Sequence, residues 1–191
     1  MRYSAIAMLL MLIFFQSLTQ ARTNEGIARV GFTYLPTGTM KMPADVEGRT
    51  FYDSFALRID LSYAVSDYLE IGPGIEFINK KVNPDATFSS KISVISALAD
   101  ARFSYPMTDS GSSNFVVGLG TGVCKLTEKG SGSATGPNIY GIIGFDIGLG
   151  KDMGLDLLLR YGFARAELEN IREYRYNGWA LQTGLNYRFK L

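Results

Sequence analysis

Residues 179–191 read WALQTGLNYRFKL, and two kinds of side chain alternate along them. A period of two residues is that of a β-strand, in which successive side chains point to opposite faces of the sheet. One face is apolar and aromatic, and the other is small, polar or charged. The first face carries Trp179, Leu181, Thr183, Leu185, Tyr187, Phe189 and Leu191, and the second carries Ala180, Gln182, Gly184, Asn186, Arg188 and Lys190. We expect this strand to close a β-barrel.

The same alternation occurs in seven earlier stretches. It is clearest in residues 54–65, where apolar residues such as Phe55 alternate with small or charged ones such as Arg58. Pro73 interrupts another stretch and cannot donate a ladder hydrogen bond, so we expect a bulge or a local gap there. Each stretch has roughly the 9–11 residues that a strand needs to cross a bilayer. The seven stretches are 27–35, 54–65, 69–77, 93–105, 115–125, 143–149 and 155–163.

Long and short connections alternate between these eight strands. The short ones are tight turns, and the long ones are predicted to be loops or irregular segments. This alternation, with an even strand count, is typical of an all-β, eight-stranded antiparallel up-and-down transmembrane β-barrel. The long connections then lie outside the cell and the short ones in the periplasm. The long connections are 36–53, 79–90, 127–138 and 165–176; the shorter ones are 66–67, 106–113 and 150–152.

The first residues have the pattern of a secretory signal peptide. Arg2 precedes an apolar run at 5–15, and small residues at 19 and 21 suit cleavage after Ala21. The run is too short to cross a bilayer as a helix, although an uncleaved anchor is the alternative. We therefore predict a cleaved signal at 1–21 and one barrel domain at 22–191.

Composition excludes several classes of function. The chain has 19 basic and 18 acidic residues, so no strong positive field favours a nucleic-acid partner. It has no histidine, the commonest general base and metal ligand. We predict no catalytic residues, no metal site and no cofactor. The single cysteine, Cys124, is expected to be a small buried residue.

The two faces of the strands differ in a way that favours lipid on the outside. The apolar face carries aromatic residues near strand ends, as in the girdles of membrane barrels. The other face carries charges in mid-strand, which would be costly in hydrocarbon. A soluble lipocalin-like barrel, with its apolar face lining a ligand cavity, is the alternative. The predicted girdle is Tyr34, Phe55, Tyr63, Phe77, Phe103, Tyr105, Phe115, Tyr161, Phe163, Trp179, Tyr187 and Phe189; the predicted polar network of the lumen is Arg29, Arg58, Asp60, Glu70, Glu76, Asp100, Arg102, Asp146, Asp156, Arg160 and Arg188.

With these features, the chain resembles the small eight-stranded outer-membrane β-barrels of the OmpA/OmpX-like family. Residues 185–191, LNYRFKL, resemble the alternating C-terminal signal of that family, although Leu191 stands where the family usually has phenylalanine. The resemblance implies a location in the outer membrane of a Gram-negative-type bacterium, surrounded by lipid. It also implies recognition by the barrel-assembly machinery through Leu185, Tyr187, Phe189 and Leu191.

An eight-stranded barrel is only wide enough for its own side chains, so we expect the inner charges to form a packed network. Nine inward glycines leave water-filled space, make room for neighbouring arginines or permit the bends that a small barrel needs. The main hypothesis is a non-enzymatic surface protein whose loops serve envelope integrity, adhesion or an extracellular or host ligand, with the loop at 165–176 as the best candidate. A narrow porin-like channel for small solutes is the second. Outer-membrane enzymes with this architecture use a catalytic histidine, which is absent here.

Overall fold

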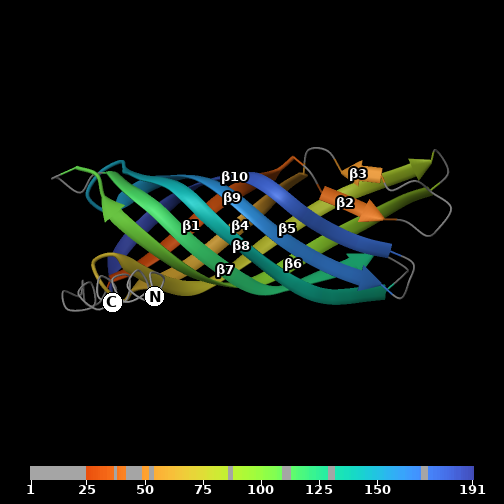
Figure 1. Cartoon of the computed structure of the whole chain (residues 1–191), viewed down its shortest axis with the longest axis horizontal. Coiled ribbons are helices and arrows are strands. Elements are labelled where there is room, and N and C mark those ends of the chain that lie inside the picture. Colours follow the sequence, from red (N-terminus) through yellow and green to blue (C-terminus); the bar gives the residue numbers. More distant parts are fainter. Residues whose placement is uncertain are drawn as a thin grey trace, which may run out of the picture.

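The computed structural model describes residues 25–36, 38–41, 49–51, 54–85, 88–108, 113–128, 132–168 and 172–191. They form one antiparallel sheet that closes on itself into an elongated barrel (Figure 1). The predicted signal peptide at 1–21 lies outside the described residues. Eight long strands make the wall: β1 (Glu25–Leu35), β4 (Ser54–Ala64), β5 (Leu69–Asp85), β6 (Phe88–Pro106), β7 (Ser113–Glu128), β8 (Gly132–Gly148), β9 (Met153–Leu168) and β10 (Arg172–Lys190).

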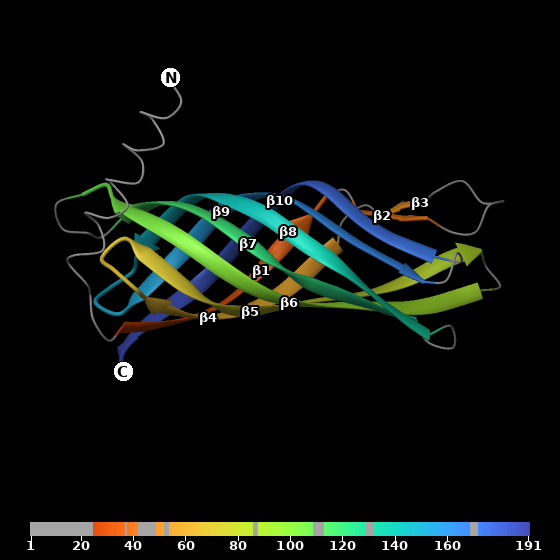
Figure 2. The same ribbon diagram turned by 60° about the horizontal axis from the view of Figure 1, so that its bottom comes forward.

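The first and last long strands close the barrel. β1 pairs with β10 from Glu25↔Lys190 to Tyr34↔Leu181, and β1 pairs on its other side with β4. The remaining strands pair in chain order, which confirms the eight-stranded up-and-down topology. The C-terminus lies at the same end as the β4–β5 turn (Figure 2). We call this the turn end and the opposite one the extended end. Within the described part of the chain, no helix is long and apolar enough to cross a membrane.

The wall at the extended end contains a short additional hairpin. Two short strands, β2 (Gly38–Lys41) and β3 (Arg49–Phe51), pair with each other, and β2 pairs with β10 where β10 runs beyond the end of β1. We predicted an irregular segment at 36–53, and this was wrong for these two strands. Both are too short to show a period in the sequence.

The long strands continue well beyond the predicted boundaries at the extended end. The predicted loops at 79–90, 127–138 and 165–176 are mostly strand, because β5 to β10 extend into them. The predicted strand at 143–149 is the last part of β8, which begins at Gly132. A strand that has left the membrane needs no apolar face, so its sequence loses the alternation that marks a strand within lipid.

Pro73 leaves a local gap in the wall, as predicted. The β4–β5 ladder contains Asp60↔Gly74 and Tyr63↔Ile71 but no pair between them, and its register is the same on both sides. On its other side, Pro73 stands opposite Ala99 in a part of the β5–β6 ladder that is continuous from Leu69↔Phe103 to Val82↔Ser90. The missing donor therefore affects one seam of the barrel only.

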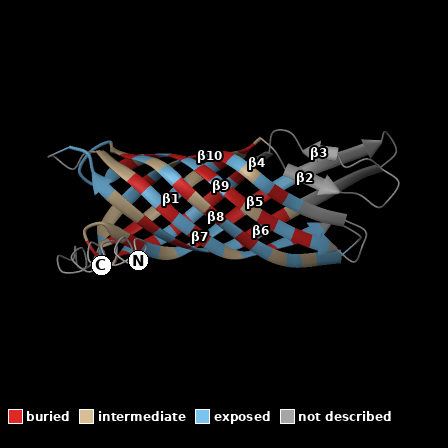
Figure 3. Cartoon of the chain, viewed as in Figure 1, coloured by how far each residue is buried: buried red, intermediate tan, exposed pale blue. Residues whose placement is uncertain are grey.

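Buried and exposed residues alternate along every long strand (Figure 3). The apolar face points outward, with Leu119 72% and Phe55 63% exposed, and the charged face points inward. The lipocalin-like alternative, in which the apolar face lines a cavity, is therefore wrong. Only an apolar solvent would accept such a surface, so the arrangement is that of a transmembrane barrel.

Candidate functional site

Charged side chains from several strands meet in the lumen nearer the turn end. Arg29 on β1 donates hydrogen bonds to Asp156 (3.1 Å), to Glu70 (2.5 Å) and to Ser62. These three residues come from β9, β5 and β4. One guanidinium thus joins four strands, and its fork of donors suits such multiple contacts.

Tyr140 on β8 organises the middle of the lumen. Its hydroxyl donates to Asp100 and accepts a 2.7 Å hydrogen bond from Arg58. Arg58 also donates to both carboxylate oxygens of Asp60 (2.9 Å each) and to Asp100. The Arg160 guanidinium carbon lies 3.8 Å from the centroid of the Tyr140 ring, a cation–π contact. The ring therefore holds two arginines in place.

Two of these contacts cross the lumen completely. In the closed ring of eight strands, β4 and β8 are four strands apart in either direction, as are β5 and β9. Arg58 on β4 reaches Tyr140 on β8, and Arg160 on β9 donates to Glu76 on β5 at 2.5 Å. Side chains from opposite walls therefore touch at the barrel axis.

The other ion pairs link these contacts to the turn end. Arg102 donates to Asp60 (2.9 Å) and to Asp156 (3.5 Å), and Arg188 donates to Asp146. Ten of the eleven residues predicted to face the lumen are buried, and the side chain of Arg188 is 23% exposed. The Arg188–Asp146 pair joins the other ion pairs through Asn186, which donates to both Asp146 and Asp156. All eleven predicted residues take part in ion pairs: Arg29, Arg58, Asp60, Glu70, Glu76, Asp100, Arg102, Asp146, Asp156, Arg160 and Arg188.

Sequence reasoning missed the uncharged members of this network. Tyr140 and Asn138 lie in the part of β8 that showed no alternation, and Asn138 links Arg160 to Ser96. Asn186 donates to Asp146 (3.0 Å) and lies on the inward face predicted for its strand. Once a strand has been recognised, its inward-facing alternate positions identify these polar residues.

Neighbouring atoms fill the space beside the inward glycines. A Cβ added at Gly74 would lie 2.2 Å from an oxygen of Asp60, and one at Gly120 would lie 2.1 Å from the ring of Tyr140. Eight of the nine inward glycines leave less than 3 Å for a Cβ: Gly72, Gly74, Gly118, Gly120, Gly122, Gly144, Gly162 and Gly184. Among the alternatives from the sequence, the structure favours room for neighbouring groups over water-filled space.

An apolar cluster occupies the lumen nearer the extended end. Cys124 is fully buried in it, as expected, and the Tyr176 hydroxyl donates to the backbone oxygen of Gly178 at 2.9 Å. This cluster follows the charged network along the barrel axis. Its members are Leu35, Ala56, Ile78, Val94, Cys124, Leu126, Ala164, Ala166, Tyr176 and Ala180. A second, smaller apolar cluster of Leu98, Val116, Tyr140, Ile142 and Leu158 includes Tyr140 of the charged network.

The predicted girdle residues all lie on outward positions of their strands. Several meet in cross-strand pairs, including Tyr34 with Phe55 and Tyr161 with Trp179, whose ring centroids are 5.1 and 4.8 Å apart. Phe55, Tyr63, Phe77, Tyr105, Tyr161, Trp179 and Tyr187 are exposed, and Tyr34, Phe103, Phe115, Phe163 and Phe189 are half-buried. Tyr68 and Phe145 were not predicted. Tyr68 stacks on Phe103, and Phe145 meets Phe115 edge to face. Within the described ranges, no group of three or more His, Cys, Asp or Glu side chains could hold a metal ion.

The chain was compared with known protein families by sequence and with solved structures by fold. The family described as "Outer membrane protein beta-barrel domain" matches residues 6–189. A comparison with curated proteins by sequence found no match. The crystal structure of Neisserial surface protein A is similar with a TM-score of 0.63 and 12% identity, covering 86% of this chain and 97% of that one. The outer membrane protein OprG from Pseudomonas aeruginosa has a TM-score of 0.61 and 14% identity, over 90% and 99% of the two chains.

Proposed function

Because the chain belongs to the outer membrane protein β-barrel family, we propose that it is a non-enzymatic surface protein of the outer membrane whose barrel is an anchor closed to solutes. The resemblance to small outer-membrane barrels seen in the sequence is confirmed by this match. Low identity to the solved barrels supports the fold alone, so the specific role rests on the chain's own geometry.

The crossing of the lumen by side chains carries the proposal. Arg58 meets Tyr140, and Glu76 meets Arg160, between strands that lie opposite each other. A solute that moved along the axis would have to break these buried contacts, and breaking one buried ion pair costs about 3–5 kcal/mol. The apolar cluster at the extended end adds a second layer, in which ions would meet few polar groups.

The extended end supplies the contact surface in this proposal. The segment at 165–176, which the sequence marked as the best candidate, supplies the outermost pairs of the β9–β10 ladder, a two-stranded ribbon that continues the barrel wall. A ribbon of paired strands displays its side chains at fixed positions, unlike a mobile loop. Contact with the cell envelope, or with an extracellular or host ligand, would be made here.

The alternating apolar residues at the end of the chain, 185–191, support assembly by the barrel-assembly machinery. Leu185 and Tyr187 are 45% and 51% exposed on the outer face of β10, and Leu191, just after the strand, is 69% exposed, so another protein can reach them during insertion. Phe189 stacks on Tyr187 with ring centroids 6.4 Å apart. We propose this set as the assembly signal.

Conductance in planar lipid bilayers tests the closed barrel. We expect a flat trace from the purified protein, after a gel has shown that unboiled protein migrates as a folded barrel. The double variant Arg58→Ala with Arg160→Ala removes both contacts that cross the lumen. It serves as the control in which the lumen is opened. Discrete single-channel steps from the wild-type protein would contradict the proposal and establish a narrow channel.

A further inference from the structure

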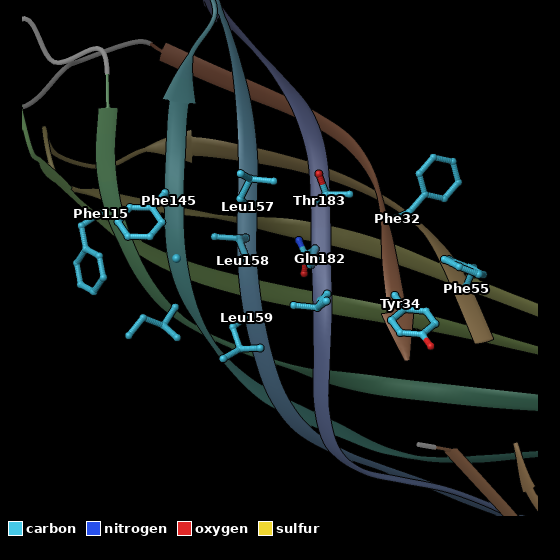
Figure 4. A pocket seen from close by; sticks show the side chains of 13 residues that line it. Phe32, Tyr34, Phe55, Phe115, Phe145, Leu157, Leu158, Leu159, Gln182 and Thr183 are labelled. Atoms are coloured by element: carbon cyan, nitrogen blue, oxygen red, sulfur yellow. The ribbon is translucent and has the colours of Figure 1, made fainter. Parts of the chain in front are cut away.

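The outer face of β9 and β10 is hollowed into an apolar groove of about 690 Å³ (Figure 4). Leu157 and Leu159 of β9, with Leu181 and Thr183 of β10, form its floor. Thr183 is the only one of these four with a polar side-chain atom. The groove opens toward the membrane, so a water-soluble ligand has no reason to enter it.

Aromatic residues form the two walls of this groove. Phe115 and Phe145 lie on one side, and Phe32, Tyr34 and Phe55 lie on the other (Figure 4). The β-sheet register places these residues in the same cross-strand rows as the floor: Phe145 is opposite Leu157, which is opposite Thr183, which is opposite Phe32. Bulky rings at both ends of a row and smaller side chains between them produce the hollow.

The same two strands carry an arginine pair beyond the groove, toward the extended end. Arg165 on β9 stands directly opposite Arg175 on β10, and both are exposed. Arg165 donates a 3.0 Å hydrogen bond to Glu167, which is one position further along the same face. Between this pair and the groove lies the exposed Tyr161–Trp179 pair, the ring type that membranes place at their interface.

The order of charges along the ribbon matches an anionic layer at the membrane surface. Two like charges directly opposite each other are unfavourable in a sheet. Here the two arginines occupy the position nearer the girdle, and two glutamates, Glu167 and Glu173, occupy the next pair outward. Phosphate at the membrane interface would attract the nearer cations and repel the carboxylate of Glu167. Arginine is also the side chain that binds phosphate through paired hydrogen bonds.

The distance between the arginine pair and the groove suits an acyl chain. Leu181 is six positions after Arg175, or about 20 Å along a strand at ~3.3 Å per residue. With a strand tilt of ~45°, this corresponds to about 14 Å along the membrane normal. One leaflet of the hydrocarbon core is ~15 Å thick, so a chain whose headgroup lies at the arginines reaches the floor of the groove.

We propose that the outer face of β9 and β10 binds one phosphorylated lipid of the outer leaflet, with its phosphate on Arg165 and Arg175 and an acyl chain in the groove. The ligand class is a membrane lipid with an anionic phosphate headgroup. This site is independent of whether the lumen conducts, so a channel result would leave it unaffected.

Competition between two lipids in one membrane tests the proposal. The full barrel is placed in nanodiscs with equal amounts of a phosphorylated outer-leaflet glycolipid, lipid A, and its dephosphorylated counterpart, and retained lipid is counted by native mass spectrometry. We expect about tenfold more of the phosphorylated lipid on the protein, from its charge-assisted hydrogen bonds to arginine. Equal retention of both lipids would overturn the proposal without any variant. Displacement of the lipid by excess inorganic phosphate would also overturn it, since it would show a site for free phosphate.

Two variants with the same change of charge locate the headgroup. Arg165→Gln with Arg175→Gln should lower retention of the phosphorylated lipid about tenfold. Lys125→Gln with Lys151→Gln removes two exposed cations outside the β9–β10 ribbon and should leave retention unchanged. Equal losses in the two variants would mean unspecific attraction and overturn the site. If the first variant does not fold, Arg175→Gln alone is compared with Lys125→Gln.

A filled groove tests the acyl-chain half of the proposal. Thr183→Trp adds a large ring to the floor and keeps both arginines, so it should lower retention of the lipid several-fold in a barrel that still migrates as folded. The corresponding change at Val123, an outward residue of β7 outside the groove, is the control and should have no effect. Unchanged retention in Thr183→Trp would place the chain elsewhere and overturn the groove.

Discussion

Arg58 on β4 donates a hydrogen bond to the hydroxyl of Tyr140 on β8, across the full width of the barrel. The same arginine binds Asp60 and Asp100, and its side chain is 2% exposed. A charge buried at the axis depends on these partners, because no water replaces them at low cost. The wall and the lumen are thus stabilised by the same residues.

Removal of Arg58 should strongly destabilise the barrel. In Arg58→Ala, the carboxylates of Asp60 and Asp100 lose a buried counter-charge, so we expect the free energy of unfolding to fall by about 3–5 kcal/mol. Urea unfolding in lipid vesicles, followed by the fluorescence of Trp179, measures this change. Lys125→Ala, an exposed cation on the outer face of β7, should change stability by less than about 0.5 kcal/mol. Equal effects of the two substitutions would contradict the assignment of inner and outer faces.

Loss of the Tyr140 hydroxyl should be costly while its ring remains useful. Tyr140→Phe keeps the ring beside the Arg160 guanidinium but leaves Arg58 and Asp100 each with one hydrogen bond fewer. We expect a loss of about 1–3 kcal/mol, the cost of unsatisfied buried polar groups. Tyr63→Phe, at an exposed outer position, is the matched control and should be near neutral. A neutral Tyr140→Phe would show that the hydroxyl is not part of the network.

The sequence predicted the strands best where lipid contacts them. Residues 54–65 were predicted and β4 spans Ser54–Ala64, because each outward position there must be apolar and each inward one must not be. The same sequence rule fails in the first part of β8, where Thr135 and Pro137 face outward beyond the membrane and need no apolar side chain. Propensity alone does not identify a strand that contains Gly132, Gly136 and Pro137.

The inward position of each charge was predictable, but its partner was not. Alternation fixes which face Arg29 occupies, yet its binding of Asp156 and Glu70 depends on strand order and register around the barrel. For Tyr140, too, the sequence pattern did not identify its contacts in the lumen. Its aromatic ring would be expected outward, but Tyr140 lies on the inward phase of β8, and the register of β8 against β7 decides that its neighbour in the lumen is Gly120.

Gly120 should tolerate no side chain, because Tyr140 occupies the space beside it. In Gly120→Ala, the added Cβ would lie 2.1 Å from the ring and 2.5 Å from an oxygen of Asp100, so the network must shift. We expect a loss of about 1–3 kcal/mol from overpacking, measured by urea unfolding in vesicles. Gly150→Ala is the control, since nothing lies within 4 Å of a Cβ in that turn. A stable Gly120→Ala protein would show that the lumen has free space, which would favour a conducting barrel.

The outward aromatic residues of the last strand should control assembly more than stability. Tyr187→Ser with Phe189→Ser removes two rings of the proposed assembly signal, whose stacked pair lies near the turn end of β10. We expect a several-fold lower yield of folded barrel in the outer-membrane fraction, read as the amount of unboiled protein with shifted gel mobility. Once folded, the variant should unfold at nearly the wild-type urea concentration, because the rings contribute surface contacts that lipid also provides. Lys190→Ser, on the opposite face of the same segment, should assemble normally. A normal yield for the double variant would show that the assembly signal lies elsewhere in the chain.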